Sequence, residues 1–580
     1  MAEVEDDSNE EKSRELELNL KRESEIVAEF CNLLEQSRQW FKSLRDLPQF
    51  GHKSWQTQFG RTFDIYTKLW KFQQENRSVL DKKYKLKRWQ IGEIASKIGQ
   101  LYYHYYLRTS ECNYLLEAFS FYTAIRSRAY YTNASKFETS DLMVKKLRYY
   151  ARFIVVTLLL NKMDFVKELV KEFRQYIDEY TMIYNPTDED DWRLVVNEVT
   201  SFCEAESLVT VMNADVTPRV LSHRLNSERP VGESERPSLS LQEIIIVGNR
   251  EKQVKFSELT LDMFRMLQAL EREPDEYQPY SLENSTDFTK DQMRKETVPS
   301  KRPNPHKYLL YKPTFSQLFT FLASGFKELP QNAVMLIYLS ADSHKVENKH
   351  TDGPYGQGGL RMSVHKGLQP AKSTRMIQSN VNETNAIYPD DLIPFTRKAM
   401  MLIVDSETST SFQSLSSVFG NPVVVLMSPS KVPHALQDTL RKGNVFTLFL
   451  HNPLVAFLYV CNITNIQVGL WEQCCQQLRG FEGDLIRLFT KLSKVVDISY
   501  IQMIDDEFLA LMIRRFIFCY YVTRQHRAFK GVEYFPSCSP SFPPQLIENE
   551  DLRKRVLTLS STLDVRGLFY ELEDIPSVNC

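Results

Sequence analysis

Apolar side chains recur at helical spacing through the first third of the chain. Ile91, Ile94 and Ile98 follow one another at intervals of three and four residues, and Leu101 continues the series. This spacing places them on one face of a helix. Similar sets occur in segments 27–44, 59–70, 115–129, 143–158 and 166–180. Because no strand pattern interrupts them, residues 21–210 are predicted to form stacked antiparallel helices, a helical-repeat interaction domain.

The helical hairpin near residue 110 is rich in aromatic side chains. Segment 98–131 holds eight tyrosines and two phenylalanines. Its pattern I-G-x-x-Y resembles half of a tetratricopeptide repeat, and the small Gly99 would let two helices approach closely. We expect most of these rings to lie in the core of the helical domain. Two alternative roles for the aromatic side chains are a stacking surface for nucleic acid and a groove for a partner helix. Tyr102, Tyr103 and Tyr106 extend beyond the core-facing stripe, so we expect some of them to line an interface or a partner groove.

Beyond residue 240 the pattern changes to short apolar runs separated by helices. Strands are predicted at LQEIIIVG, KYLLYKP, AVMLIYLSAD, AMMLIVDS and PVVVLMSP, and one of the intervening helices at SFQSLSSVFG. Apolar runs alternating with helices are typical of parallel strands buried on both faces. Residues 241–580 are therefore predicted to form a mainly parallel α/β domain, closed by long helices near 470–495 and 500–528.

Polar stretches separate or interrupt these regions. Residues 1–20 begin with a strongly acidic run and are predicted to be a disordered tail. Residues 211–240, rich in Pro, Ser and charge, are predicted to be a linker or long loop, and 271–306 and 341–390 are predicted polar excursions from the α/β domain. The expected fold class is thus a helical-repeat, tetratricopeptide-like domain followed by a mainly parallel α/β domain with long loop insertions.

One apolar run, residues 445–463, is almost long enough to span a bilayer. His451, Asn452 and Pro453 lie at its centre, where polar groups and a proline would be costly in lipid. We therefore expect a buried strand, a turn at Pro453 and a second buried element, and no membrane span.

Composition narrows the class of protein. The 580 residues carry a net charge of −2, so no overall field favours nucleic acid or membranes. The nine cysteines are scattered and include no C-x-x-C pair, which indicates a reducing compartment without a disulfide framework or zinc site. The first eleven residues contain six acidic and no basic side chains, a composition unlike that of signal and transit peptides.

Two segments resemble ligand-binding motifs. In VDSETST, Asp405, Glu407 and Ser409 resemble a D-x-S-x-S metal-adhesion site, except that Glu407 replaces the first serine. Oxygen ligands at the end of a strand could hold Mg²⁺, but we favour a strand end whose polar residues cap the next helix. The glycine-rich segment 352–359 lacks a following G-K-S/T, and we interpret it as a flexible loop. No hydrolase, zinc-protease or kinase signature occurs, so no catalytic, metal or cofactor-binding residue is assigned and no cofactor is expected.

Two basic stretches could contact phosphates or serve as nuclear-import signals. The first is the patch Lys82, Lys83, Lys85, Lys87 and Arg88. The second spans residues 300–307. For both, the alternative is a solvated surface, which we favour.

Long stretches of the chain resemble a known family. KSWQTQFGRTFDIYTKLWKFQQENRSVL, YYHYYLRTSECNYLLEAFSFYTAIRSRAYY and LIVDSETSTSFQSL are similar to the SCAI family, suppressors of cancer cell invasion. The resemblance covers essentially the whole chain but assigns no site. It implies a transcriptional corepressor, found in nucleus and cytoplasm, that binds the myocardin-related transcription factor and represses serum response factor target genes.

The same resemblance implies a place downstream of Rho and formin signalling, a limit on cell migration and invasion typical of a tumour suppressor, and a second role in the chromatin response to DNA double-strand breaks. We expect no direct sequence-specific DNA binding and no enzymatic activity. The alternative is a nucleotide- or metal-binding enzyme that uses the α/β domain. A pocket at the carboxyl ends of the strands that gathers polar groups would favour this alternative.

Overall fold

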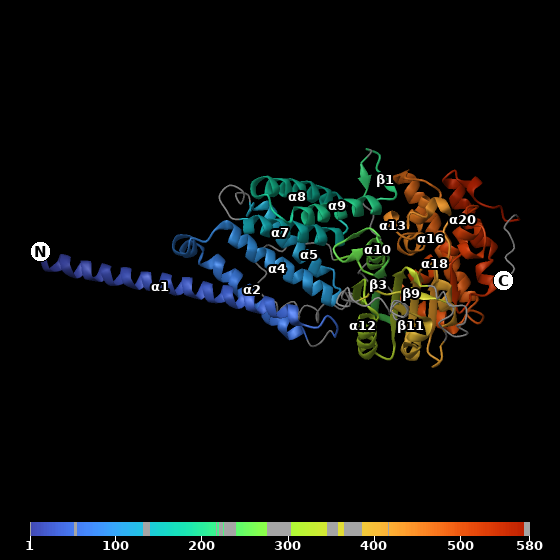
Figure 1. The fold of residues 1–580 in the computed structure, drawn as a ribbon, viewed down its shortest axis with the longest axis horizontal. Coiled ribbons are helices and arrows are strands. Elements are labelled where there is room, and N and C mark those ends of the chain that lie inside the picture. Colours follow the sequence, from blue (N-terminus) through green and yellow to red (C-terminus); the bar gives the residue numbers. More distant parts are fainter. Residues whose placement is uncertain are drawn as a thin grey trace, which may run out of the picture. The chain divides into compact units, whose positions relative to one another are not determined.

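The computed structural model describes residues 2–51, 55–131, 140–215, 217–219, 224–225, 239–274, 303–344, 358–364, 385–415 and 417–573. The chain divides into two compact units. Unit 1 consists mainly of residues 2–160 and 165–189, and unit 2 mainly of residues 190–273 and 303–573. In Figure 1 the described part of unit 1 contains helices, and unit 2 contains both strands and helices.

The helices of unit 1 confirm the helical prediction. They are α1 (Ala2–Ser43), η1 (Leu44–Asp46), α2 (Gln56–Glu75), α3 (Arg77–Val79), η2 (Leu80–Tyr84), α4 (Arg88–Thr109), α5 (Asn113–Ser127), α7 (Ser140–Leu159) and α8 (Met163–Tyr184). The predicted stripe of α4 is buried, as Ile91, Ile98 and Leu101 show. A tetratricopeptide repeat is not confirmed, since α4, α5 and α7 have 22, 15 and 20 residues instead of a regular pair of lengths.

Helix α1 includes residues 2–20, for which the sequence predicts a disordered tail. From Arg14 onward the segment is rich in Glu, Leu, Lys and Arg, which are good helix formers. Leu16 and Leu20 nevertheless remain exposed to solvent. The intrinsic helix propensity of these residues, and not the burial of apolar side chains, therefore accounts for this part of the helix.

Aromatic rings fill the space between the helices of unit 1. Tyr106, Tyr122 and Tyr131 are buried. The hydroxyl of Tyr149 in α7 donates a hydrogen bond of 2.8 Å to the Tyr122 carbonyl oxygen in α5. Close approach of α4 and α5 depends on Gly99, where an added Cβ would lie 2.9 Å from the Tyr122 ring.

Unit 2 contains the strands β1 (Thr210–Met212), β2 (Pro218–Arg219), β3 (Ser240–Asn249), β4 (Lys255–Phe256), β5 (Leu259–Thr260), β6 (His306–Tyr311), β7 (Ala333–Ala341), β8 (Ser343–His344), β9 (Gly359–Arg361), β10 (Ala386–Ile387), β11 (Ala399–Asp405), β12 (Val423–Met427), β13 (Asn465–Gln467) and β14 (Ser537–Ser539). Its helices and 3₁₀ turns are α9 (Glu189–Glu206), α10 (Leu261–Ala269), α12 (Phe315–Glu328), η4 (Pro389–Arg397), η5 (Ser409–Ser414), η6 (His434–Leu436), α13 (Thr439–Lys442), α14 (Val445–His451), α15 (Pro453–Val460), α16 (Val468–Lys491), α17 (Ile498–Met503), α18 (Glu507–Gln525), η7 (Val532–Tyr534), α19 (Pro544–Ile547), α20 (Glu550–Thr562) and η8 (Arg566–Leu568).

The main sheet has the strand order β14-β12-β11-β7-β3-β6. All neighbours are parallel except β14, which runs antiparallel to β12. The strands predicted at Val334–Leu339, Met401–Val404 and Val423–Met427 are confirmed, with Met401 opposite both Leu336 and Val424. Strands β7, β11 and β12 are buried along their whole length, as expected for apolar strands covered on both faces.

Helix α9 from Asp190 onward belongs to unit 2, whereas the sequence suggests a boundary near residue 210. The Phe202 ring of α9 lies 4.6 Å from that of Phe256 and 5.2 Å from that of Phe264. These edge-to-face contacts anchor α9 to the β4–α10 region. The helical pattern of α9 resembles that of unit 1, and so sequence periodicity does not reveal which core it joins.

The apolar run 445–463 is buried, as predicted, but the strand expected at its start is wrong. Its residues form α14 and α15, which meet at Asn452. The Asn452 side chain accepts a hydrogen bond from the Val455 amide, and Pro453 begins α15, where its missing N–H costs nothing. Among the described helices, none is both long and apolar enough to cross a membrane.

The helix predicted at SFQSLSSVFG is also wrong, because the described residues of this segment form no α-helix and include the end of the 3₁₀ turn η5. Ser411 donates a hydrogen bond to the Thr408 carbonyl oxygen, and Ser414 donates one to that of Ser411. Such local bonds from serine compete with the α-helical pattern.

Parts of the predicted polar stretches 211–240, 271–306 and 341–390 lie outside the described residues. The same holds for most of the glycine-rich segment, although Gly359 begins β9. In the described parts of the third stretch, β8, β9 and β10 form a small antiparallel sheet.

We expect Gly99→Ala to destabilise the protein by about 1–3 kcal/mol, because the new methyl group would press on the buried Tyr122 ring. The matched control is Gly60→Ala in α2, where nothing lies within 4 Å of the new Cβ. That control should stabilise the protein by up to about 1 kcal/mol through helix propensity. Urea unfolding followed by circular dichroism measures both, and equal effects would contradict the close-packing role of Gly99.

Candidate functional site

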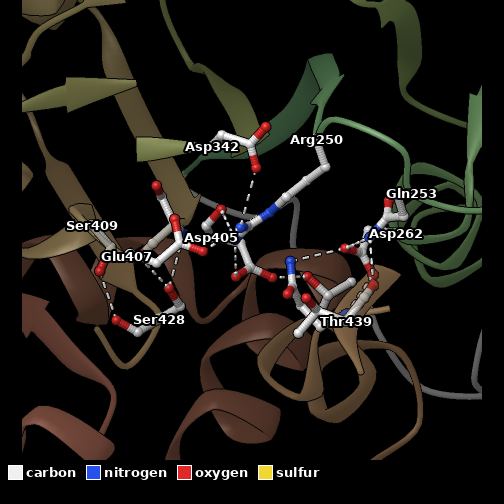
Figure 2. A network of polar contacts seen from close by, with 12 residues as sticks. Arg250, Gln253, Asp262, Asp342, Asp405, Glu407, Ser409, Ser428 and Thr439 are labelled. Carbon is white, nitrogen blue, oxygen red and sulfur yellow. Dashed lines mark hydrogen bonds and ion pairs between the residues drawn. The ribbon is translucent and has the colours of Figure 1, made fainter. Parts of the chain in front are cut away.

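The candidate site lies at the carboxyl ends of the parallel strands in unit 2. The chain passes from β3 outward to β6, then returns across β3 to β7 and continues to β11 and β12. The order therefore reverses between β3 and β7, and ligands of open α/β sheets bind in the crevice beside such a reversal. Figure 2 shows polar side chains from several strand ends pointing towards one another in this region.

Arg250 is the centre of this network. It follows β3 directly and is only 6% exposed. Its Nη1 lies 2.6 Å from Glu407 Oε1 and 3.8 Å from Asp342 Oδ1. Its Nη2 lies 3.6 Å from Asp405 Oδ1 and donates a hydrogen bond of 3.1 Å to the Asp405 carbonyl oxygen. One guanidinium thus joins the ends of β3, β7 and β11, as Figure 2 shows.

Burial and neighbouring charges shift the pKa values of these groups in opposite directions. Burial alone would lower the pKa of Arg250, but Asp405 and Glu407 outweigh it and raise that pKa above its ordinary value. For Asp405, burial outweighs the attraction of Arg250 and raises the pKa to about 7. Burial also raises the pKa of Glu407, but the charge and hydrogen bond of Arg250 prevail there, so its pKa is lowered. The difference follows exposure, since the Glu407 side chain is 49% exposed and that of Asp405 4%.

Further hydrogen bonds hold Asp405 in place. Its Oδ2 accepts a bond of 2.5 Å from the hydroxyl of Thr447 in α14. The Thr447 oxygen lies 2.6 Å from the hydroxyl of Tyr338 in β7. Neighbouring Asp262 in α10 is fully buried, and it accepts bonds from the Gln253 side chain and from the amide and side chain of Asn444. Burial raises the pKa of Asp262 as well.

Serine side chains tie the ends of β11 and β12 together. The Ser428 hydroxyl accepts a bond of 3.0 Å from the Ser406 amide and donates one of 3.1 Å to the Ser406 carbonyl oxygen. The Ser409 hydroxyl donates a bond of 2.7 Å to the Ser428 carbonyl oxygen. The buried hydroxyl of Ser406 itself has no hydrogen-bond partner within the described part of the chain.

A cavity of about 360 Å³ opens beside this network. It is lined by the ends of β3, β11 and β12, by the segment that leads into α14, and by α18 with the loop after it. Phe446, Phe529 and Tyr534 contribute aromatic walls, and Arg250 and Asp405 contribute charged ones. This volume lies within the usual range for small-molecule pockets.

The three residues of the metal-adhesion pattern do not converge on a metal. Asp405 and Glu407 both bind Arg250, and Ser409 binds a backbone oxygen. Within the described ranges, no group of three or more acidic, histidine or cysteine side chains could hold a metal ion. The favoured helix-capping role of Asp405 is also wrong, since its carboxylate bonds to Thr447 and Arg250.

Sequence reasoning missed Arg250 and Asp262. The available signal for Arg250 is its position immediately after a buried parallel strand, in the sequence IIIVGNR. That position places a side chain at the ligand-binding edge of an open α/β sheet. Asp262 gives no comparable signal, because acidic residues in the first turn of a helix are common for electrostatic reasons alone.

The predicted partner tyrosines lie in α4 with different exposure. Tyr106 is 2% exposed and belongs to the core. Tyr102 is partly buried, and its ring lies 5.0 Å from that of Phe63. Tyr103 is also partly exposed, and its ring lies 6.0 Å from that of His104.

The predicted basic patch lies at the surface between α2 and the start of α4. Its members are all exposed: Lys82, Lys83, Lys85, Lys87 and Arg88. Lys83 forms an ion pair of 3.0 Å with Glu23, and Arg88 donates a hydrogen bond of 2.6 Å to the Arg128 carbonyl oxygen. In the second basic stretch, residues 300–302 lie outside the described ranges, and Lys307 is buried in β6.

We expect Arg250→Met to destabilise unit 2 by about 3–5 kcal/mol, because it leaves Asp405 buried without its cation. The control is Arg219→Met, which removes an exposed ion pair with Glu472 and should cost less than about 1 kcal/mol. Denaturant unfolding measures both variants. A change at Arg250 as small as that at Arg219 would show that the network contributes little to the fold.

The pKa of Asp405 predicts how stability varies with pH. Because folding raises this pKa to about 7, its contribution is present at acidic pH and is lost as the pH rises from about 4 to 7. Asp405→Asn cannot ionise, so it should flatten this decline in the free energy of unfolding. Ser409→Ala serves as a non-titrating control and should keep the wild-type slope. Unfolding series at several pH values test this, and an unchanged slope in Asp405→Asn contradicts it.

Comparison with known proteins agrees with the resemblance seen in the sequence. The family model described as Protein SCAI matches residues 32–529. Proteins named Protein SCAI from Homo sapiens and Mus musculus are each 50% identical over 555 residues, which cover 95% of this chain and 90% of the relative. The Protein SCAI homolog of Dictyostelium discoideum is 34% identical over 714 residues, covering 95% of this chain and 92% of the relative. The chain therefore belongs to the SCAI family.

Proposed function

We propose that the protein is a transcriptional corepressor that binds the myocardin-related transcription factor and thereby represses serum response factor target genes. The observation that carries this proposal is the match to the SCAI family along nearly the whole chain. The proposal places the protein in the nucleus and cytoplasm, downstream of Rho and formin signalling, where it would limit cell migration and invasion. It assigns a binding function and no enzymatic one.

Unit 1 offers a suitable surface for such a partner. Tyr103 and Leu107 are four residues apart on α4, so they lie on the same side of the helix. Tyr103 is partly exposed and Leu107 is 38% exposed. Partner helices that dock in grooves depend on aromatic and aliphatic anchors with this spacing. We therefore propose the Tyr103–Leu107 face as part of the binding surface for the transcription factor.

A role in the response to DNA double-strand breaks is the second part of the proposal, and it rests on the family resemblance. The exposed basic patch near residue 85 is compatible with contacts to phosphate groups. Phosphate contacts do not read base sequence, and so we propose no sequence-specific DNA binding. Chromatin proteins of the break response are the proposed partners in this role.

We expect Tyr103→Ala in the full chain to weaken transcription-factor binding about tenfold, which corresponds to about 1.4 kcal/mol. Its melting temperature should change little because Tyr103 is partly exposed. Tyr106→Ala should instead lower the melting temperature, since that side chain is buried. Tyr184→Ala in α8 removes another partly buried tyrosine of unit 1. It is the control for any effect on binding that the loss of a tyrosine side chain elsewhere in the unit would cause.

Pulldown and calorimetry with the purified transcription factor measure affinity, and a serum response factor reporter measures repression. If Tyr103→Ala and Tyr184→Ala bind the factor equally well, the Tyr103–Leu107 face is not the binding surface. If the wild-type chain does not bind the factor, the proposed function itself fails.

A further inference from the structure

We propose that the cavity at the carboxyl ends of β3, β11 and β12 binds a small organic cation, namely an amine with an aromatic or alkyl body and a neutral hydroxyl group. This inference is independent of the proposed transcriptional function. It rests on the position of the cavity, its unpartnered polar atoms, its charge and its aromatic walls.

Two buried polar atoms of lining residues have no hydrogen-bond partner among the residues that the structure describes. The Ser406 hydroxyl belongs to a residue that is 1% exposed, and Nε of Arg250 belongs to one that is 6% exposed. Both residues line the cavity. Buried polar atoms almost always have a hydrogen-bond partner in native proteins. A ligand that donates to the Ser406 oxygen and accepts from Arg250 Nε would satisfy both.

The charge around the cavity favours a cation. Asp342, Asp405 and Glu407 all pair with the single guanidinium of Arg250. The other cation of the lining, Lys431, lies at the rim, 3.4 Å from Glu533. Even without Asp405, whose raised pKa leaves it only partly ionised near pH 7, the carboxylates of Asp342 and Glu407 outnumber the one guanidinium between them, and an additional positive charge would be attracted.

The same contacts argue against other ligands. An anion would find both terminal nitrogens of Arg250 already engaged with carboxylates, and it would face Asp405 and Glu407 directly. A divalent metal would need at least three ligands in one place, and the guanidinium of Arg250 occupies the space between the acidic side chains (Figure 2). An ammonium group needs only one or two of these oxygens, and so it is compatible with Arg250 remaining in place.

The aromatic walls of the cavity indicate which uncharged body the ligand carries beside its ammonium group. Phe446, Phe529 and Tyr534 are the aromatic residues of the cavity lining. Aromatic rings bind apolar groups, and their faces also attract cations. A body of one aromatic ring or a short alkyl chain fits a volume of about 360 Å³. The ammonium would lie near Asp405 and Ser406, and the hydroxyl near Arg250.

The test uses three probes of nearly the same shape on the full chain. They are 2-amino-1-phenylethanol, which is a cation, 1-phenyl-1,2-ethanediol, which is neutral, and mandelate, which is an anion. Saturation-transfer NMR and calorimetry measure binding of each. We expect the amine to bind at least about tenfold more tightly than the other two. No binding of the amine, or tighter binding of mandelate, the diol or Mg²⁺, would overturn the proposal.

A pair of serine variants locates the site. Ser406→Ala should weaken amine binding about fivefold or more, which corresponds to the loss of one hydrogen bond. Without ligand it should melt no lower than the wild type, because it removes an unpartnered buried hydroxyl. Ser409→Ala removes a structural bond to Ser428, so it should melt lower but keep the wild-type affinity. Equal affinity of Ser406→Ala and wild type would place the amine elsewhere and overturn the proposal.

Discussion

The contact between Arg250 and Asp405 is the interaction on which the carboxyl edge of the sheet depends. The Arg250 guanidinium would not be stable alone in the interior, because an isolated buried charge costs several kcal/mol. Together with Glu407 and Asp342, Arg250 and Asp405 join the segments after β3, β7 and β11. The Asp405 carboxyl group then fixes Thr447, which connects the sheet to α14. The geometry of the cavity follows from these contacts.

Local patterns in the sequence were sufficient to predict most of the elements. The stripe through Ile91 and Ile98 predicts α4 because helical spacing depends only on residues within one or two turns. The apolar runs at 334–339 and 401–404 predict buried parallel strands for a similar reason. The errors lie where a few hydrogen bonds decide between conformations. At 445–463 the apolar run shows no clear period, and the cap at Asn452 with Pro453 selects two helices. At 409–414 serine side chains select a 3₁₀ turn.

The site could be predicted only in part. Asp405, Glu407 and Ser409 were found because they follow a recognisable strand, but their partners lie far away in sequence. Arg250 and the Asp405 carbonyl oxygen are 155 residues apart, and only the order of strands in the sheet brings them together. That order depends on the whole core of unit 2. The sequence therefore showed a resemblance to a metal site, which we did not favour, but gave no indication of the arginine that the fold supplies there.

The two units differ in the kind of ligand that their side chains suit. The Tyr103–Leu107 face of unit 1 presents apolar and aromatic groups at helical spacing, which suits another protein segment. The cavity of unit 2 presents carboxylates, an unpartnered hydroxyl and aromatic walls, which suits a small molecule. A ligand in the cavity stabilises unit 2 by mass action. It changes the affinity of unit 1 for a protein partner only if each of the two binding events favours one state of the chain over another, and that coupling must be equal in both directions. Measuring partner affinity with and without a bound amine therefore determines whether the cavity regulates the interaction surface or functions independently of it.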